Sequence, residues 1–415
     1  GSIPSEMGGL TNLSQLFLHD NQLTNNIPDN FCDLNLNWSS VTYFNISNNQ
    51  LCPPFPSCIQ NYVGLQNYNQ CPFSMFENTY GGTGSDYGRS VQQTSDGGYI
   101  ISGIKQYNFW DSYLLKTDSE GNEEWSKLFG GNGDEYSNSV QQTNDGGYIS
   151  GGNWLIKTDS EGNEEWVNES ISSEMVKQTF DGGYILINTY NYDDGSSDVL
   201  LIKTDSQGNE EWSKTLGGSG SELGYDVDLT IDGGYIVTGY TIYSYDSDGD
   251  IYLVKTDSEG NEEWSKNIGG TLHDGGYSVQ HTIDYGYIIV GTTNSFSGSQ
   301  DVYLVKTDSE GNEEWSKTFG STSSDEGRSV KQTLDGGFII TGVGRFGSNT
   351  PKVYLIKTDS QGNEEWSKNF GSGHSEGYSV DVTSDNSYII TGHTSSSNNS
   401  WEVYLIKTDP YGNIQ

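Results

Sequence analysis

The stretch KTDSEGNEEWSK runs from Lys116 to Lys127 and recurs along most of the chain. Full copies or close variants begin at Lys157, Lys203, Lys255, Lys306 and Lys357, and a shortened copy, KTDPYGN, begins at Lys407. The seven starting points lie 41 to 52 residues apart. Repetition at a nearly fixed period indicates one structural unit written seven times.

Each copy belongs to a unit of four predicted strands, and the sixth unit shows their order. Its strands are predicted over 326–334, 338–342, 353–359 and 364–371. The connecting Asp-Gly-Gly and Gln-Gly-Asn runs supply the positive-φ positions that tight hairpins require. The strand runs, such as FIITG and VYLIKTD, are rich in β-branched and aromatic residues. Four short strands in a unit of about 40 to 50 residues are typical of a propeller blade.

Seven third strands are present, but only six complete fourth strands follow them. The missing strand is predicted at the other end of the repeat region, where FENTYGG over 76–82 matches the fourth-strand pattern EWSKTFGG. We therefore expect a mainly β fold in which residues 72–415 form a seven-bladed β-propeller of four-stranded blades. Strand 76–82 completes the last blade and leaves no open edge in the ring.

This closure is similar to that of kelch and WD-type propellers. The repeated pattern, DGGYI followed by YLIKTD, GN and W, resembles the repeats of secreted bacterial surface proteins, which are often fused to adhesive modules. The resemblance covers residues 76–415. It implies an architecture rather than an activity.

A large aromatic ring begins each fourth strand. These residues are Trp125, Trp166, Trp212, Trp264, Trp315 and Trp366, with Phe76 in the seventh unit. A ring at one fixed strand position suits packing between neighbouring blades. The recurring phrase is thus predicted to be scaffold, and an alternative role of its acidic turn in calcium binding is disfavoured because Gln207 and Gln361 replace the glutamate.

Residues 1–71 follow a different period. Leu13, Leu16, Leu18, Asn21 and Leu23 spell LxxLxLxxNxL, and Val41, Phe44, Ile46, Asn49 and Leu51 repeat it 28 residues later. This pattern resembles the extracellular leucine-rich repeat. The resemblance implies the end of a solenoid, closed by the cysteine-containing and proline-containing segment after Leu51 as a cap. The chain opens inside a motif, so we expect it to be part of a longer polypeptide.

All four cysteines, Cys32, Cys52, Cys58 and Cys71, lie in this first segment. Four cysteines allow three pairings, and two disulfides are expected. A zinc site is the alternative, but the spacings contain no CxxC. Disulfides imply an oxidising setting, so we predict an extracellular or cell-surface location.

The net charge is −38, from 57 acidic and 19 basic residues. Such a field disfavours nucleic acid as a partner, because phosphate binding needs clustered Lys and Arg. No apolar run approaches the roughly 20 residues of a membrane helix, so no membrane insertion is expected in this segment.

The loops that differ between copies are the candidate binding surface. In a four-stranded blade the first and third connections share one face, and they are uniform here. The second connection and the one between blades share the other face, and they vary in length and content. The candidate ligand-binding aromatics on that face are Tyr107, Phe109, Trp110, Tyr192, Tyr245, Phe296, Phe346 and Trp401. Exposed rings suit stacking on sugars or gripping a protein; the alternative is that they fold back on their own loops.

Acidic residues form two further patterns. Before the first strand of five blades stand Asp86, Glu135, Glu222, Asp274 and Asp325. These could ring the pore and hold a cation or an amine, and the favoured alternative is that each caps backbone N–H groups of its own loop. A DSDGD loop with Asp246, Asp248 and Asp250 is similar to short calcium loops, and it predicts a possible Ca²⁺ site there. No cofactor is required.

The sequence shows none of the catalytic motifs sought, namely a nucleophile elbow, a phosphate-binding loop or a free cysteine nucleophile. The five histidines, at positions 19, 273, 281, 374 and 393, show no metal-ligand spacing. We therefore expect a non-enzymatic surface or secreted protein that binds other proteins or itself, as in adhesion, a filament or a matrix. The alternative is a carbohydrate-binding or carbohydrate-active propeller.

Overall fold

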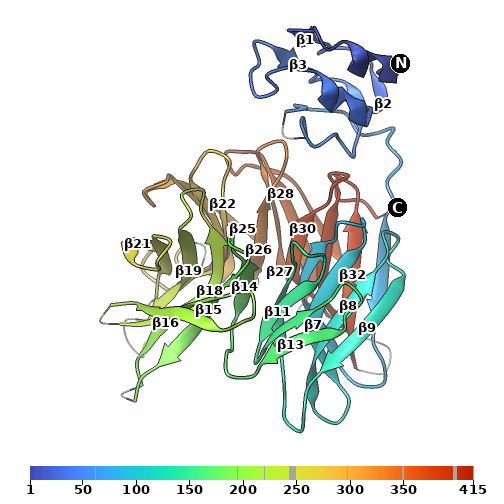
Figure 1. Ribbon diagram of the computed structural model, residues 1–415. Coiled ribbons are helices and arrows are strands. Elements are labelled where there is room, and N and C mark those ends of the chain that lie inside the picture. The colour runs from blue at the N-terminus through green and yellow to red at the C-terminus, as the bar shows by residue number, and fades with distance from the viewer. Residues whose placement is uncertain are drawn as a thin grey trace.

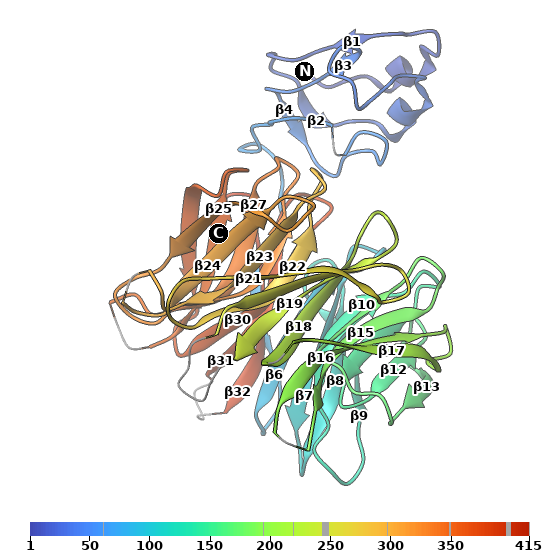
Figure 2. The ribbon, with the colours of Figure 1, turned by 90° about the vertical axis from the view of Figure 1, so that its left-hand side faces the viewer.

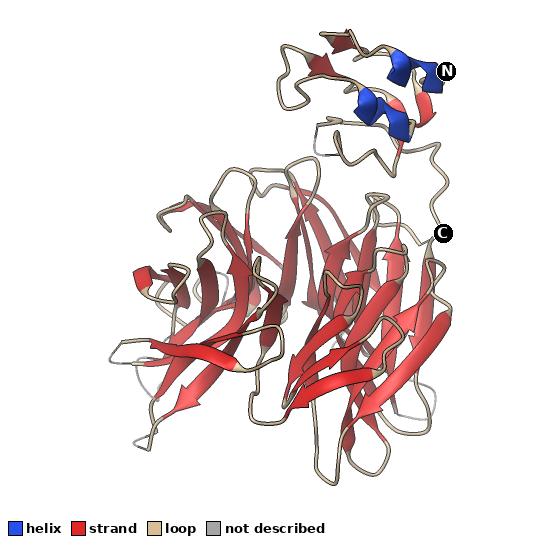
Figure 3. Ribbon diagram, in the orientation of Figure 1, coloured by secondary structure: helices blue, strands red, loops and turns tan. Residues whose placement is uncertain are grey.

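The structure is a computed structural model of the 415-residue chain. It describes every residue except Asn61, Asp194, Ser219, 243–248, Ser297, 348–349, 396–399 and Gln415. Short strands dominate the described residues, and the helical segments among them are two 3₁₀ turns near the N-terminus, η1 (Ser5–Gly9) and η2 (Asp29–Asp33) (Figure 3).

Seven four-stranded antiparallel sheets stand around a common axis (Figures 1 and 2). Blade one contains β6 (Asp86–Gln93), β7 (Tyr99–Gln106), β8 (Trp110–Thr117) and β9 (Glu123–Phe129). Blade two contains β10 (Ser137–Gln142), β11 (Tyr148–Gly152), β12 (Leu155–Thr158) and β13 (Glu164–Asn168), and blade three contains β14 (Met175–Gln178), β15 (Tyr184–Asn191), β16 (Ser197–Thr204) and β17 (Glu210–Leu216). The predicted seven-bladed propeller is confirmed.

The remaining blades repeat this order. Blade four contains β18 (Ser221–Leu229), β19 (Tyr235–Ile242), β20 (Ile251–Thr256) and β21 (Glu262–Ile268), and blade five contains β22 (Asp274–His281), β23 (Tyr287–Thr293), β24 (Asp301–Thr307) and β25 (Glu313–Phe319). Blade six contains β26 (Glu326–Gln332), β27 (Phe338–Gly344), β28 (Lys352–Thr358) and β29 (Glu364–Phe370), and blade seven contains β30 (Ser375–Val382), β31 (Tyr388–Ser395), β32 (Trp401–Thr408) and β5 (Phe76–Tyr80).

The ring closes as predicted, because β5 pairs antiparallel with β32. Phe76 lies opposite Lys407, and this register matches that of Trp125 opposite Lys116 in blade one. Strands from the two ends of the repeat region therefore share one sheet, which removes the exposed edges that an open array would leave.

The aromatic ring of each fourth strand packs against the next blade. The ring of Trp125 lies 5.7 Å from that of Tyr148. Gly162, in the third turn of blade two, has a φ of +75°, and a Cβ there would lie 2.6 Å from the Trp125 ring. The tryptophan and the turn glycine of the next blade thus form one contact between blades, so the predicted structural role is confirmed.

The lysine of each repeated phrase is buried inside its own blade. Lys116 is 2% exposed, and its ammonium nitrogen lies 2.9 Å from Asp96 and 2.7 Å from Glu124. Asp96 belongs to the Asp-Gly-Gly turn and Glu124 to the fourth strand, so one cation ties the first turn to the outer edge of the blade. In blades two to six the equivalent lysine likewise contacts the aspartate of the first turn and the glutamate of the fourth strand. The lysine and glutamate of the phrase therefore recur because they form the same ion pairs in each of these blades.

The N-terminal segment forms two short parallel ladders. β1 (Leu16–Phe17) pairs with β3 (Phe44–Asn45), and β2 (Thr24–Asn26) pairs with β4 (Gln50–Cys52). Leu16 faces Phe44, an offset of 28 residues that equals the repeat length in the sequence. The described residues do not extend this arrangement into a solenoid, so the leucine-rich-repeat assignment stays a prediction.

Two disulfides join the four cysteines, as expected. Cys32 pairs with Cys58, and Cys52 pairs with Cys71. Among the described residues no cysteine is free. Two disulfides favour folding in an oxidising compartment.

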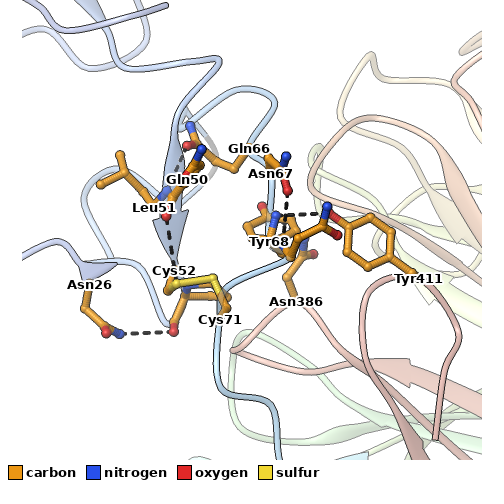
Figure 4. The surroundings of a disulfide bond; sticks show 12 residues. Asn26, Gln50, Leu51, Cys52, Gln66, Asn67, Tyr68, Cys71, Asn386 and Tyr411 are labelled. Atoms are coloured by element: carbon orange, nitrogen blue, oxygen red, sulfur yellow. Dashed lines mark hydrogen bonds between the residues drawn. A yellow bond between two sulfur atoms is a disulfide. The ribbon is translucent and has the colours of Figure 1, made fainter. Parts of the chain in front are cut away.

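The N-terminal segment rests on the face that carries the uniform turns (Figure 1). The backbone N–H of Tyr68 donates to the hydroxyl of Tyr411 at 3.0 Å, and Asn386 donates to the hydroxyl of Tyr68 at 3.3 Å (Figure 4). Asn386 lies in the turn between β30 and β31, and Tyr411 lies in the turn that follows β32. We call this end the turn face, and the opposite end, with the variable loops, the loop face. The N-terminal segment therefore leaves the loop face uncovered.

Candidate ligand-binding face

The first strands of the seven blades surround a narrow central cavity of about 270 Å³. Around this cavity, side chains of one first strand accept hydrogen bonds from backbone N–H groups of the first strand of the next blade. Asp226 accepts from Val279 at 2.9 Å, and Ser139 accepts from Val176 at 3.0 Å. These bonds saturate polar groups that would otherwise be buried without partners.

Charged side chains inside this cavity are also paired. Lys177 lies 2.7 Å from Asp228, whose other oxygen accepts the N–H of His281. Burial raises the pKa of Asp226 and of Asp381, and nearby lysines offset part of this effect. These polar and charged groups of the cavity are paired with one another and hold the blades together. We therefore place the candidate site at the mouth of the cavity.

The mouth on the loop face is built from β-bulges. A register shift in six first strands turns one residue per strand out of the ladder. The residues at these shifts are Arg89, Asn138, Tyr225, Tyr277, Arg328 and Tyr378. The bulges therefore place guanidinium, amide and phenol groups side by side around the axis.

All three arginines of the chain lie on this face, at positions 89, 328 and 345. Arg89 and Arg328 approach the ring of Tyr378 from the two flanking blades, at 4.4 and 4.1 Å from its centroid. Arg328 also lies 2.8 Å from Glu326 and 2.9 Å from Glu376. Within the described part of the chain, Arg89 is the arginine without an ion pair to a carboxylate.

Arg89 lines a pocket of about 520 Å³ at the mouth. The other lining residues come from blades two and three, and they are Tyr136, Asn138, Gly152, Asn153, Ser172, Ser173, Glu174 and Asn188. The pocket lies where the loop between β11 and β12 is reduced to Asn153 and Trp154. A shortened loop thus opens a polar pocket beside an unpaired guanidinium group.

Two histidines and a glutamate meet in blade seven. The ligand atoms of His374, Glu376 and His393 all lie within 4.8 Å of one another. Burial lowers the pKa of His393 to about 3. The spacing of the histidines along the chain gave no sign of this cluster, because sheet register joins residues that are far apart in sequence.

The five acidic residues predicted at the pore are buried instead where the loops between blades meet the first strands. Each accepts the backbone N–H of the residue four positions earlier, as Asp86 does from Gly82 at 2.9 Å. The same contact is made by Glu135, Glu222, Asp274 and Asp325. None of the five lines the central cavity. The capping alternative is confirmed, and the pore-ring placement was wrong because it ignored the orphaned N–H groups of each loop.

The predicted aromatic surface divides into exposed and folded-back rings. Tyr107 and Phe296 are 78% and 55% exposed, and Phe109 and Tyr192 are also exposed. Phe296, Phe346 and Trp401 contact other rings, of Tyr303, Tyr354 and His393 respectively. Trp110 contacts Tyr87. Tyr245 lies outside the described residues.

The predicted calcium loop is described only in part. Asp246 and Asp248 lie outside the described residues. The backbone N–H of Asp250 donates to the hydroxyl of Thr241 at 3.3 Å. In the repeated phrase the aspartate after the threonine accepts hydrogen bonds from its own turn, as Asp118 does from Asn122 at 2.8 Å, which is ordinary turn chemistry.

Comparison with known proteins supports the fold. No family model matches the chain, and no curated protein sequence matches it. The structure of YCF48 bound to D1 peptide aligns over 82% of this chain and 98% of that one, with a TM-score of 0.51 and 12% identity. Sqt1 from Chaetomium thermophilum aligns over 79% and 87%, with a TM-score of 0.49 and 10% identity. At 12% identity the likeness to YCF48 shows the propeller fold alone.

A protein of unknown function from Bacteroides caccae aligns over 70% of this chain and 97% of that one, with a TM-score of 0.44 and 12% identity.

Among the described residues no helix is both long and apolar enough to cross a bilayer.

Proposed function

We propose that the chain is a non-enzymatic binding protein whose loop face captures a polypeptide segment that carries a carboxylate. The observation that carries this proposal is the guanidinium group of Arg89, which lines a polar pocket of about 520 Å³ and forms no ion pair with a carboxylate among the described residues. The likeness to YCF48, solved with a bound peptide, supports a peptide as the occupant of a propeller of this size.

Charge distribution favours an anionic group at this point. The net charge is −38, yet the three arginines gather on the loop face. Arg328 is already paired with Glu326 and Glu376, so Arg89 is the cation left for a ligand. A guanidinium fork recognises a carboxylate through two parallel hydrogen bonds. Asn138 and Asn153 line the same pocket. The amide of Asn138 donates to Glu174 and the side-chain oxygen of Asn153 accepts the N–H of Tyr136, so we assign the amide nitrogen of Asn153 to bonding the backbone of an extended segment.

The N-terminal segment gives the protein a second surface. We propose that it is the end of a leucine-rich-repeat array, since its strands pair at a 28-residue offset. The amide of Asn49 donates to Leu18 and Ile46 at 2.9 Å, which is the backbone-bonding role that the repeat pattern gives this asparagine. Because this segment rests on the turn face, a leucine-rich-repeat array and the loop face would bind their partners at opposite ends of the propeller. Such an arrangement suits a secreted or cell-surface adhesion protein, including one that assembles with itself.

The binding proposal is tested with short peptides in which Asp and Glu are compared with Asn and Gln at the same positions. We expect acidic peptides to bind the full chain. Arg89→Gln should lower the affinity for these peptides at least tenfold, which corresponds to about 1.4 kcal/mol of binding free energy. Lys127→Gln, on the outer strand β9, is the matched loss of one positive charge and should leave affinity unchanged. Equal weakening by both variants would show that net charge, rather than the pocket, governs binding.

A glycan array on the same two variants addresses the carbohydrate alternative. Binding of neutral oligosaccharides that survives Arg89→Gln would favour stacking on the exposed rings of Tyr107 and Phe109 over recognition of a carboxylate.

A further inference from the structure

A rigid hairpin holds the three potential ligands in blade seven. Glu376 and His393 are direct partners in the β30–β31 ladder. His374 directly precedes β30 and is held against Ser395 by two hydrogen bonds, because the Ser395 N–H donates to the His374 carbonyl at 2.8 Å and the His374 N–H donates to the Ser395 hydroxyl at 3.1 Å. The hairpin and these bonds together bring the three side chains within reach of one another.

The side chains are close and partly unsatisfied. The Nε2 atom of His374 lies 2.9 Å from Oε1 of Glu376. His393 is 4% exposed, and its Nδ1 atom has no hydrogen-bond partner among the described residues. A buried ring nitrogen without a partner is costly unless something occupies the adjacent space. The side chain of His374 is 38% exposed, which leaves a path from solvent.

A second layer of residues fixes these groups. Trp401 packs against both imidazoles, at 4.7 Å from the ring of His374 and 4.8 Å from that of His393. Arg328 contacts Oε2 of Glu376 at 2.9 Å and leaves Oε1 directed to the histidine. Arg328 also pairs with Glu326 at 2.8 Å. One arginine therefore faces two glutamates, and the three groups together carry one net negative charge, which Glu376 brings to the cluster. Such outer contacts orient metal ligands in known sites.

The geometry points to a metal site formed by His374, Glu376 and His393 that takes a divalent transition metal of the Zn²⁺ class. Two imidazole nitrogens with one carboxylate oxygen form a mixed set that suits Zn²⁺ or Co²⁺ better than Ca²⁺ or Mg²⁺, which prefer all-oxygen sets. Three protein ligands leave a coordination position for water or for a donor atom of a bound partner. The site touches Tyr87 of blade one, 4.7 Å from His393, and so lies at the junction where the ring closes.

The test uses the full chain without a polyhistidine tag. Zn²⁺ is titrated calorimetrically in a millimolar background of Ca²⁺, which occupies the many surface carboxylates. We expect one equivalent to bind, and His374→Gln to weaken it at least tenfold. His281→Gln, a histidine at the end of β22 on the turn side, should bind as the unchanged protein does. Co²⁺ should give visible absorption bands that His374→Gln abolishes.

Thermal unfolding gives a second measurement, because a ligand that binds only the folded state raises the Tm. Zn²⁺ should raise the Tm of the unchanged chain and of His281→Gln, and leave that of His374→Gln unaltered. His374 is partly exposed, so this variant is expected to fold, and circular dichroism verifies that it does. The site is overturned if the unchanged chain binds no Zn²⁺ above the Ca²⁺ background, or if His374→Gln binds it equally well.

Discussion

Lys407 is buried with its ammonium nitrogen 2.8 Å from a carboxylate oxygen of Asp385, and among the described residues it has no second carboxylate within ion-pair distance. In blade one the equivalent lysine contacts both Asp96 and Glu124. The difference follows from ring closure, because the fourth strand of blade seven comes from the other end of the repeat region and places Met75 where the other blades have glutamate. The repeat lysine of blade seven therefore depends on a single ion pair.

Asp385→Asn should destabilise the propeller more than Asp96→Asn. Asparagine keeps the oxygen that accepts the turn N–H in each case, so the two variants differ mainly in what remains for the lysine. Removing the one partner of a buried charge costs about 3–5 kcal/mol, whereas Lys116 keeps Glu124. Urea unfolding of the two variants measures the difference. Equal losses would mean that Glu124 contributes nothing to holding its lysine.

Acid should weaken these contacts within a defined pH range. Burial disfavours the charged form of Asp96, but hydrogen bonds from Thr94 and Lys116 outweigh it and lower its pKa to about 2. Asp181 and Asp232 behave alike, with pKa values of about 2. A pKa lowered from an unfolded value of about 3.9 adds stability that is present above about pH 4 and is lost as the pH falls toward 2.

The measurement is unfolding free energy as a function of pH for the unchanged chain and for Asp96→Asn. The unchanged chain should lose more stability between pH 4 and pH 2 than the variant, which cannot lose the contribution of residue 96. Asp226 and Asp381 oppose this trend, since burial raises their pKa, and they are retained in both proteins so that their effect cancels.

Much of the scaffold follows from the repeat, because period-based reasoning works where every copy is alike. The register of Phe76 opposite Lys407 was predictable from the missing seventh fourth strand. The clustering of His374 with His393 was not, since it depends on which residues of β30 and β31 face each other, and the sequence alone does not show that register. The bulges that expose Arg89 were equally hidden, because a bulge changes the direction of a side chain without a clear mark in composition.

The seventh copy of the repeated phrase departs from the others in its turn. Pro410 and Tyr411 replace the usual Ser and Glu or Gln of the turn. The structure gives these two residues a role of their own. Both residues line a cavity of about 260 Å³ against the N-terminal segment, together with Val63 and Leu65. The seventh turn differs because it is the docking point.

Tyr411→Glu, which restores the residue of the first copy, should release the N-terminal segment from the propeller. The change removes the acceptor of the Tyr68 N–H and places a charge beside apolar groups. Limited proteolysis in the connecting residues 72–75 should become faster, and the radius of gyration from X-ray scattering should increase. Tyr411→Phe retains the ring and loses the hydroxyl, so it should show an intermediate effect. Unchanged proteolysis in both variants would show that other contacts hold the two parts together.

Reduction should separate the stabilities of the two parts, because both disulfides lie in residues 1–71. The Cys52–Cys71 bond closes a loop of 19 residues, for which the lost chain entropy corresponds to about 3 kcal/mol. It also lies directly beside Tyr68, the residue that docks on blade seven (Figure 4). A Cys52→Ser, Cys71→Ser double variant should therefore unfold its N-terminal segment at a lower temperature, and lose the Tyr68 contact with it. The propeller transition should stay where it is, since the cysteine-free blades gain nothing from either bond. Calorimetry would resolve two transitions in the variant; a single transition shifted as a whole would show instead that the segment and the ring unfold as one unit.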